Sequence, residues 1–220
     1  MTKVVIALAS VRGRSGKDTL IEELRKAGHQ VTRVAFGDTL KVACASELAS
    51  SRFSEETLLE FFHSNHKDVL MDDLRVTSLP QSDYKDWLLG LVTDPSWNQE
   101  PRSPRWHLQM YGTEYRREFY NEPDVWLNAG LKEIEKSPAG LVVVSDLRQR
   151  NEYAKLLRTP GLHVNTVWLH RMWFVPGVDD APYHKTDLDL LGRSMDAVVL
   201  NEWGSPSDMV TQLEKQLGGL

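Results

Sequence analysis

Residues 10–19 read SVRGRSGKDT, and they directly follow the apolar stretch VVIALA at 4–9. The amphipathic run DTLIEELRKAG overlaps their end. A buried strand, a small basic loop and a helix in this order form the context of the phosphate-binding pattern G-x-x-x-x-G-K-[ST]. Gly16 and Lys17 occupy the places of the last glycine and the lysine. The stretch therefore predicts a βα unit that binds phosphate, with a plain turn and a solvated basic loop as the alternative.

The chemistry of a triphosphate explains these residue types. It requires inward-pointing backbone N–H groups, the positive end of a helix and a lysine that reaches the outer phosphates. Gly13 and Gly16 are expected to allow turns that a Cβ would hinder. We therefore expect ATP to contact the stretch made of Arg14, Ser15, Gly16, Lys17, Asp18 and Thr19.

Two positions depart from the usual pattern. Val11 stands where the first glycine is usual, and Asp18 stands where a Ser or Thr normally ligates magnesium. A carboxylate is also a hard oxygen ligand, so Asp18 is a candidate to hold Mg²⁺ directly or through water. The hydroxyl of Thr19 comes one residue late. Stabilisation of the helix N-terminus is the competing role for Asp18.

The rest of the chain alternates strands with helices. Short Val-rich runs predict buried parallel strands, and they lie at 4–9, 140–145, 163–169 and 196–201, with a more alternating, edge-like run at 30–36. Helical stretches lie between them, at 17–27, 39–50, 124–136, 149–158 and 206–217. The alternation predicts an α/β fold, a single domain over 1–220 in which a central five-stranded parallel sheet is flanked by helices in three layers.

Two segments interrupt this alternation. The first, about 51–125, is polar, aromatic and broken by prolines, and we expect an insertion that is partly helical. Within it, Ser54 is the expected N-cap of a helix from about 54 to 63. The second, about 171–193, is rich in Pro, Gly and Asp and is expected to form a lid. Both follow the carboxyl ends of strands or the helices next to them, where open α/β sheets bind ligands.

Composition narrows the class of protein. The 220 residues carry a formal net charge of −5, which argues against a general nucleic-acid-binding protein. Cys44 is the single cysteine, so no intrachain disulfide can form, and a cytoplasmic location is expected. Its apolar, helix-like surroundings predict that Cys44 is buried. No apolar run approaches the roughly 18 residues of a membrane span, and the N-terminus does not read as a signal peptide.

The stretch RSGKDT after a short Val/Ile strand resembles the phosphate loop of the bacteriophage deoxynucleoside monophosphate kinases. That family also lacks the first glycine and has Asp after the lysine. The resemblance implies a fold like that of the nucleoside monophosphate kinases in the P-loop NTPase superfamily. It also implies ATP, Mg²⁺ and a dNMP as ligands, and the host cytoplasm as the location. The animal-type phosphomevalonate kinases share the GKD variant, so this stretch alone does not choose the acceptor.

Further segments resemble the acceptor side of that family. AFGDTLK at 35–41 resembles a turn whose lysine faces the acceptor nucleotide, which nominates Lys41. The segment 105–126 resembles one in which an arginine precedes a Gly-Thr pair and a later tryptophan. An arginine there suits the acceptor phosphate because guanidinium matches phosphate oxygens in a bidentate way. The nominated residues are Arg105, Gly112, Thr113 and Trp126, with Arg75 as a further candidate in the least-matched region.

The stretch VVVSDLRQRNEYAKL at 142–156 carries a D-x-R-x-x-x-E pattern that resembles the third strand of the family and its following turn. Asp146 is a candidate to meet magnesium through water or to accept a hydrogen bond from the nucleotide. Arg148 is a candidate for the transferring phosphate or the acceptor, and Glu152 for holding Arg148 or meeting the base. A helix N-cap is the competing role for Asp146.

The stretch HRMWFVPGVDDAPYHKT, after the fourth expected strand, resembles the family's lid. It nominates Arg171 to stabilise charge on the phosphoryl group in flight. The resemblance also implies that His184 and Thr186 face the acceptor, although Asp187 stands where the family often has Glu. The loop NEWGSPSDM follows the last expected strand and resembles the loop that wraps adenine, which nominates Asn201.

These segments run in order along nearly the whole chain. Together they predict an ATP- and magnesium-dependent kinase that phosphorylates deoxynucleoside 5′-monophosphates for phage DNA synthesis. Its catalytic residues would be Lys17, Asp146, Arg148 and Arg171. Another small-molecule kinase, of phosphomevalonate or dephospho-coenzyme A, and a non-catalytic nucleotide-binding protein remain alternatives. No nucleic-acid or membrane partner is expected. The sequence does not decide which bases are accepted, or whether the chain forms the homodimer compatible with the family.

Overall fold

A computed structural model describes residues 2–180, 183 and 185–219, without the side chains of Lys185 and Thr186. The chain divides into two compact units. The first, here called the sheet unit, contains the chain up to Phe36 together with the chain from Ala129 onward. The second, here called the helical unit, spans Gly37–Asn128. The insertion expected at about 51–125 falls within the helical unit, which begins earlier in the chain.

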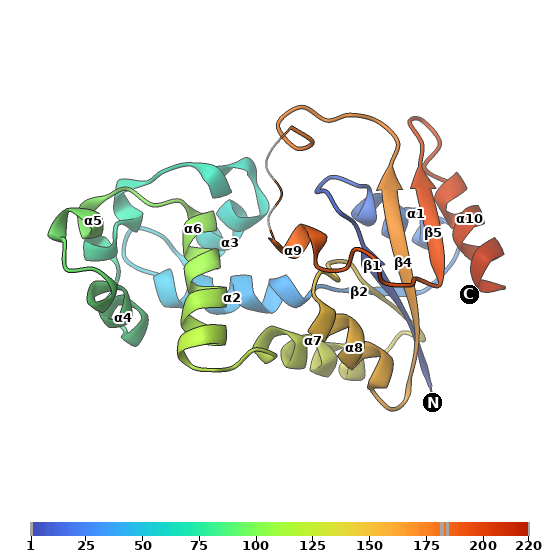
Figure 1. The fold of residues 1–220 in the computed structure, drawn as a ribbon, viewed down its shortest axis with the longest axis horizontal. Helices are drawn as coiled ribbons and strands as arrows, with labels where there is room; N and C mark the ends of the chain where they lie inside the picture. The colour runs from blue at the N-terminus through green and yellow to red at the C-terminus, as the bar shows by residue number, and fades with distance from the viewer. Residues whose placement is uncertain (1, 181–182, 184, 220) are drawn as a thin grey trace. The chain divides into compact units, whose positions relative to one another are not determined.

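The sheet unit is built on a five-stranded parallel sheet in the order β2-β3-β1-β4-β5 (Figure 1). Its strands are β1 (Lys3–Ala9), β2 (Val31–Val34), β3 (Leu141–Val144), β4 (Leu162–Arg171) and β5 (Ala197–Asn201). The predicted α/β fold with a central five-stranded parallel sheet is therefore confirmed. The run at 30–36 forms an edge strand, as its alternating pattern indicates.

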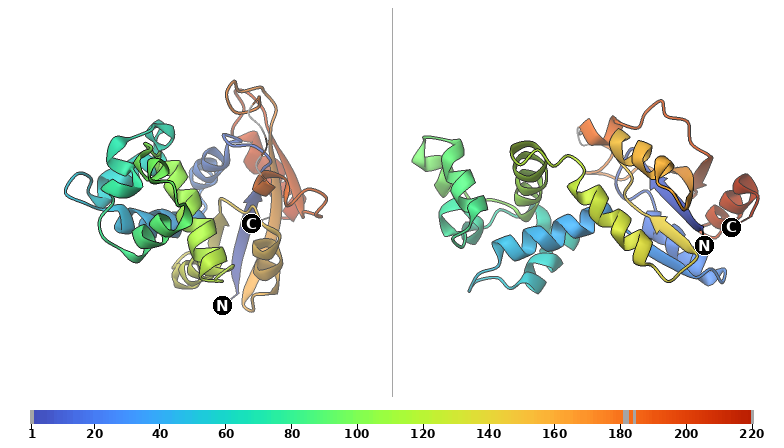
Figure 2. Two further views of the ribbon diagram at one scale, coloured as in Figure 1. Left: turned by 60° about the vertical axis from the view of Figure 1, so that its left-hand side comes forward. Right: turned by 90° about the horizontal axis from the view of Figure 1, so that it is seen from below.

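Helices cover both faces of this sheet (Figure 2). Those confined to the sheet unit are α1 (Lys17–Lys26), α8 (Arg150–Arg158), α9 (Lys185–Leu188) and α10 (Asp208–Leu217), while α2 (Phe36–Leu48) and α7 (Val125–Lys136) have residues in both units. On one face, Ile6 and Leu8 of β1 pack in a fully buried cluster with Leu20 and Leu24 of α1 and Leu213 of α10. Each such side chain contributes about 1.5–3 kcal/mol by leaving water.

Strand order places the loop after β1 at a topological switch point. The chain leaves β1 toward β2 on one side of the sheet and leaves β4 toward β5 on the other. Because β1 and β4 are neighbours, their following segments diverge and open a crevice at the carboxyl edge, the position where open α/β sheets bind ligands. Ala9 lies opposite Trp168 in this register, so residues 10–16 leave the sheet beside the last residues of β4.

The helical unit contains no strand within its described residues beyond an isolated bridge between Met71 and Arg102. Besides most of α2 and the start of α7, its elements are α3 (Glu55–His63), η1 (Asn65–Asp68), η2 (Asp72–Leu74), η3 (Val76–Ser78), α4 (Asp83–Leu91), α5 (Pro95–Gln99), α6 (Pro104–Gln109) and η4 (Met110–Phe119). Ser54 caps α3 by accepting from the N–H of Thr57 at 3.2 Å, and Cys44 is fully buried, which confirms both predictions. None of the described helices combines the length and the apolar character that crossing a membrane requires.

The element η4 is a π-helix, which sequence periodicity did not foresee. Its ten residues continue directly from α6. π-helical turns are rare and occur frequently at functional sites.

Candidate phosphate-binding site

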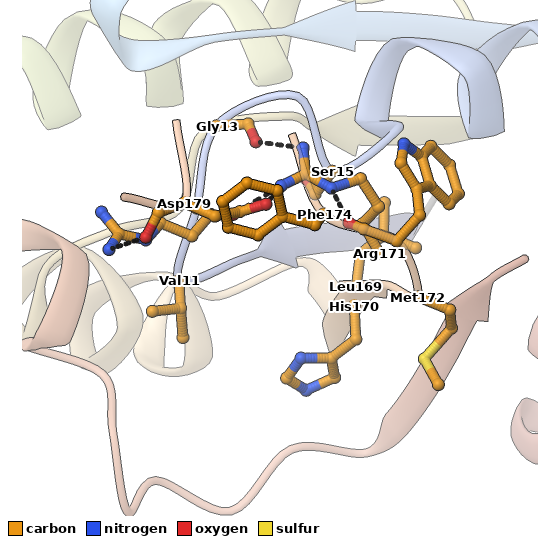
Figure 3. A pocket seen from close by; sticks show the side chains of 11 residues that line it. Val11, Gly13, Ser15, Leu169, His170, Arg171, Met172, Phe174 and Asp179 are labelled. Carbon is orange, nitrogen blue, oxygen red and sulfur yellow. Dashed lines mark hydrogen bonds and ion pairs between the residues drawn. The ribbon is translucent and has the colours of Figure 1, made fainter. Parts of the chain in front are cut away.

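Side chains from the ends of β4 and β5 hold the backbone of the loop after β1. The guanidinium of Arg171 donates from Nη1 to the carbonyl oxygen of Gly13 at 3.2 Å (Figure 3). The same Nη1 donates to the carbonyl oxygen of Arg14 at 3.1 Å. Asn201 donates from Nδ2 to the carbonyl oxygen of Ser15 at 3.0 Å. Three successive carbonyl groups are thus bound by the body of the sheet unit.

This arrangement turns the intervening N–H groups the other way. In a trans peptide the N–H points opposite to the C=O, and the described residues contain no cis peptide bond. The N–H groups of Arg14, Ser15 and Gly16 therefore face away from Arg171 and Asn201. No acceptor within residues 2–180, 183 and 185–219 takes these three hydrogens. Successive outward N–H groups in a turn with left-handed residues form a concave nest that binds anions.

The left-handed residues of this loop are Arg14, with φ 55°, and Gly16, with φ 97°. Two features favour glycine at position 16. Its φ is positive, and a Cβ there would lie 2.1 Å from Nδ2 of Asn201. The expected need for glycine at position 13 is wrong. Gly13 does not adopt a left-handed conformation and has open space around its Cα, because the turn is made by Arg14 instead.

Lys17 is the first residue of α1 and its ammonium group lies at the loop. Its Nζ donates to Oγ of Ser10 at 2.6 Å and to Oγ of Ser15 at 3.4 Å. The pKa of Lys17 is lowered from 10.5 to about 8, mainly by burial and to a lesser extent by the nearby charge of Arg148. Three carboxylates oppose this effect, those of Asp146, Asp18 and Asp187. The predicted residues Asp18, Asp146 and Arg148 therefore each lie within electrostatic range of Lys17.

The two carboxylates nominated for magnesium differ in their surroundings. The Asp18 side chain is 85% exposed in the first turn of α1, and its Oδ1 lies 3.4 Å from Nε of Arg33. Oδ1 of Asp146 accepts from the N–H of Phe36 at 2.8 Å, so this carboxylate also holds the first residue of α2. The described residues contain no cluster of three or more His, Cys, Asp or Glu side chains able to bind a metal ion by themselves. Oxygen ligands of this kind suit a Mg²⁺ that takes its other ligands from phosphate and water.

The turn after β3 is held by Glu152 in a way that its sequence pattern did not specify. This buried carboxylate accepts from the N–H groups of Arg148 and Gln149, each at 3.0 Å, and so caps α8. It holds Arg148 through the backbone. The Arg148 side chain is about half exposed, and its Nη1 lies 3.3 Å from Oδ1 of Asp187. Arg148 is thus a cation near Lys17 that a ligand can reach.

Arg171 has a different character, because its donors are already engaged. Besides the two loop carbonyls, Nε donates to the carbonyl oxygen of Trp173 at 2.8 Å, and Nη2 lies 2.6 Å from both carboxylate oxygens of Asp179. The side chain is 5% exposed. Arg171 therefore ties the loop to the start of the segment after β4. The sequence did not single out Asp179, because its only local signal is that it stands next to Asp180.

A pocket of about 410 Å³ lies between this loop and the end of β4 (Figure 3). Its lining includes Trp173 and Phe174, and the Phe174 side chain is largely exposed. Trp203, in the loop after β5, meets Trp173 edge to face with ring centroids 5.2 Å apart, and 79% of Trp203 is exposed. Exposed aromatic surface of this kind offers flat faces on which a planar group can stack. Asn201, expected to contact adenine, is a buried residue whose side-chain amide supports the loop by its bond to Ser15.

In the helical unit, two of the nominated cations face the same short segment. Nζ of Lys41 lies 2.9 Å from Oδ1 of Asp38 and 3.4 Å from Nδ1 of His63, the last residue of α3. The guanidinium of Arg105 pairs with Asp68 in η1. Arg75 pairs with its near neighbour Asp72. Lys41 and Arg105 thus border the stretch from the end of α3 through η1.

Gly112 and Trp126 take part in packing. Nε1 of Trp126 donates to the carbonyl oxygen of Gly112 at 3.0 Å, and the indole is 4% exposed. A Cβ on Gly112 would lie 2.7 Å from a methyl group of Leu40, so a larger residue there would force the Leu40 side chain to shift. Thr113 is partly buried on η4. The remaining nominations, His184 and the side chain of Thr186, lie outside the described residues.

Comparisons with known proteins do not identify a function for this chain. No protein-family model matches the chain, and no curated protein matches it. Among solved structures, TT1252 from Thermus thermophilus is similar over 99% of this chain and 98% of that chain, with 16% identity and a TM-score of 0.41. An unliganded sugar kinase from a Janibacter species is similar over 99% and 95%, with 10% identity and a TM-score of 0.35. Likenesses this distant carry no argument about activity.

Proposed function

We propose that the protein is a kinase that transfers the γ-phosphoryl group of ATP to a deoxynucleoside 5′-monophosphate. One observation carries the proposal: the loop after β1 turns the N–H groups of Arg14, Ser15 and Gly16 outward beside the partly buried ammonium of Lys17. This nest lies at the switch point of a parallel sheet, and a βα loop of this form suits a polyphosphate. The choice of a dNMP rests on the sequence resemblance.

In this proposal the chain mainly positions and neutralises phosphate groups. The N–H nest and Lys17 hold the outer phosphates of ATP, and Arg148 neutralises charge on the group in transfer. Arg171 holds the backbone of the nest through its bonds to the carbonyl oxygens of Gly13 and Arg14. Asp18 and Asp146 would hold Mg²⁺, which when bound neutralises charge on the phosphate oxygens. No side chain has to act as a general base, because the acceptor oxygen is already anionic.

The two nucleotides would use different parts of the chain. Trp173 and Trp203 offer the donor base an aromatic surface beside the pocket next to the loop. Lys41 and Arg105 are the cations best placed for the acceptor phosphate, since both border the segment from the end of α3 through η1. Their aspartate partners would then exchange for phosphate oxygens, which make strong charge-assisted hydrogen bonds.

Release of ADP from ATP–Mg²⁺ tests the proposal directly. The purified protein is assayed with dAMP, dCMP, dGMP and dTMP, with the four ribonucleotide counterparts, with phosphomevalonate and with dephospho-coenzyme A. We expect release that depends on one or more dNMPs and that falls at least a hundredfold in Lys17→Met. The matched control is Lys26→Met, an exposed lysine at the other end of α1.

The other outcomes separate the alternatives. ADP release only with phosphomevalonate or dephospho-coenzyme A would support kinase activity and show that the acceptor is not a dNMP. ATP binding without release for any acceptor would favour a non-catalytic nucleotide-binding protein. Full dNMP kinase activity in Lys17→Met would contradict the role of the loop.

A further inference from the structure

A second pocket lies wholly within the helical unit, and most of its residues have no role in the site described above. Its volume is about 570 Å³, within the range of small-molecule sites. Its walls come from α2, from the start of α4 and from the π-helix η4 with the residues that follow it. The lining residues are Glu47, Ser82, Asp83, Tyr111, Tyr115, Arg116, Tyr120 and Glu122.

One side of this pocket is aromatic. The Tyr111 and Tyr115 ring centroids lie 5.6 Å apart, and those of Tyr115 and Tyr120 lie 5.0 Å apart. The hydroxyl oxygens of Tyr115 and Tyr120 are 3.3 Å from each other. Tyr111 and Tyr115 both belong to η4, so the π-helix brings these two rings to one wall. Tyrosines provide flat apolar faces together with polar tips.

The pocket also carries carboxylates that have no cationic partner. Its one cation, Arg116, pairs with Glu122 at 2.6 Å. In the described part of the chain, no group donates a hydrogen bond or ion pair to the side chains of Glu47 or Asp83. Both carboxylates line the same pocket as Tyr115. Their charges contribute to raising the pKa of Tyr115, after burial and the contact with Tyr120. The lining is therefore acidic, which disfavours phosphate and favours a group with N–H donors.

We infer that this pocket receives the base of the acceptor nucleotide and favours bases that carry an amino group. The inference rests on the proposed function, and it names the substrate class of that enzyme as dNMPs of cytosine, guanine or adenine. A base stacks on the tyrosine wall while Glu47 or Asp83 accepts from its amino group, as carboxylates do with the amino group of cytosine. Thymine carries a carbonyl oxygen where cytosine carries this amino group. That oxygen would face a carboxylate, which has no hydrogen to donate. Sites built to bond an N–H discriminate strongly against analogues that lack it.

The test measures kcat/KM for the four dNMPs and, separately, the binding of nucleosides that have no phosphate. We expect the preferred amino-bearing dNMP to exceed dTMP at least tenfold in kcat/KM. The substitution Glu47→Gln keeps the shape but supplies N–H donors, so the preference should fall at least fivefold, mainly through KM. Asp83→Asn, at an exposed position, should act in the same direction and serves if Glu47→Gln folds poorly. Glu60→Gln, an exposed glutamate on α3 outside the pocket, should change nothing.

Nucleoside binding separates this inference from the proposed function. Saturation-transfer NMR should show deoxycytidine, deoxyguanosine or deoxyadenosine binding more tightly than thymidine, with the difference lost in Glu47→Gln. If that holds while no dNMP releases ADP, the pocket is confirmed and the kinase proposal fails. If dNMPs release ADP but dTMP serves as well as the others, or Glu47→Gln and Asp83→Asn leave the preference intact, the kinase stands and the inference is overturned.

Discussion

Replacing Lys17 by Met should abolish phosphate binding and at the same time stabilise the protein. The ammonium group is held at the loop, with Ser10 Oγ at 2.6 Å and Ser15 Oγ at 3.4 Å, and burial opposes its charge. Methionine keeps the length and apolar stem of the side chain. It removes the charge that a phosphate would need and that the free protein accommodates at a cost in stability.

The size of the effect follows from the pKa. A pKa lowered from 10.5 in the unfolded chain to about 8 in the folded one corresponds to roughly 3 kcal/mol of destabilisation, since one pKa unit is worth about 1.4 kcal/mol. Loss of the hydrogen bond to Ser10 lowers the stability of the variant by about 1 kcal/mol, which partly offsets this gain. The expected net gain for Lys17→Met at pH 7 is therefore about 2 kcal/mol in the free energy of unfolding.

The pH dependence gives this gain a distinctive sign. Below pH 8, Lys17 is charged in both states, and the folded protein carries the full penalty. Between about pH 8 and 10.5 the folded state releases its proton while the unfolded state keeps it, so wild-type stability rises with pH relative to the variant. Urea unfolding of wild type and Lys17→Met at pH 7 and at pH 10 measures the difference, which should shrink or reverse at the higher pH.

A different pattern would refute this reasoning. If Lys17→Met is less stable than wild type at pH 7, and the difference does not change up to pH 10, then the ammonium group is not destabilised by burial. The control Lys26→Met should give only a small difference, because that lysine is exposed on the same helix.

Three further substitutions probe the loop and its surroundings. Gly16→Ala places a Cβ against Asn201 at a positive φ, and should lower the free energy of unfolding by more than about 2 kcal/mol in urea denaturation. Arg171→Lys loses the bidentate fork and most of its bonds to the loop. It should raise the dissociation constant for ATP about tenfold in calorimetry, with unchanged affinity contradicting its positioning role. Trp203→Ala should raise KM for ATP severalfold at unchanged kcat, because an exposed indole beside Trp173 contributes stacking alone.

The sheet was predictable because its signals are local. Val-rich runs of six or seven residues mark strands wherever they stand in the chain. The alternating run at 30–36 forms an edge strand, as its pattern indicates. The place of Lys17 at the junction of loop and helix was equally predictable, since strand, loop and helix follow one another directly. Ser54 belongs to the same class, because an N-cap depends only on the residues next to it.

The parts that escaped prediction depend on partners distant in the chain. Arg171 was expected at the phosphoryl group, yet its guanidinium reaches back to the carbonyl oxygens of Gly13 and Arg14. Nothing in the sequence near position 171 reveals these two bonds to the loop. Asn201 similarly supports Ser15 from the end of β5. The acidic pocket in the helical unit is made by residues from three elements, and the π-helix that forms one wall has no periodic signature in its sequence.

The support given by Asn201 has a consequence for how the protein is made. The loop at residues 10–16 leaves the ribosome early, but one of its anchors is the last residue of β5 and the other is the last residue of β4. The nest therefore has all of its supporting bonds only after β5 has joined the sheet, because a nascent chain that stops short of β5 lacks the bond to Ser15. Affinity for a polyphosphate should then appear late in synthesis, as a sign that the sheet is complete.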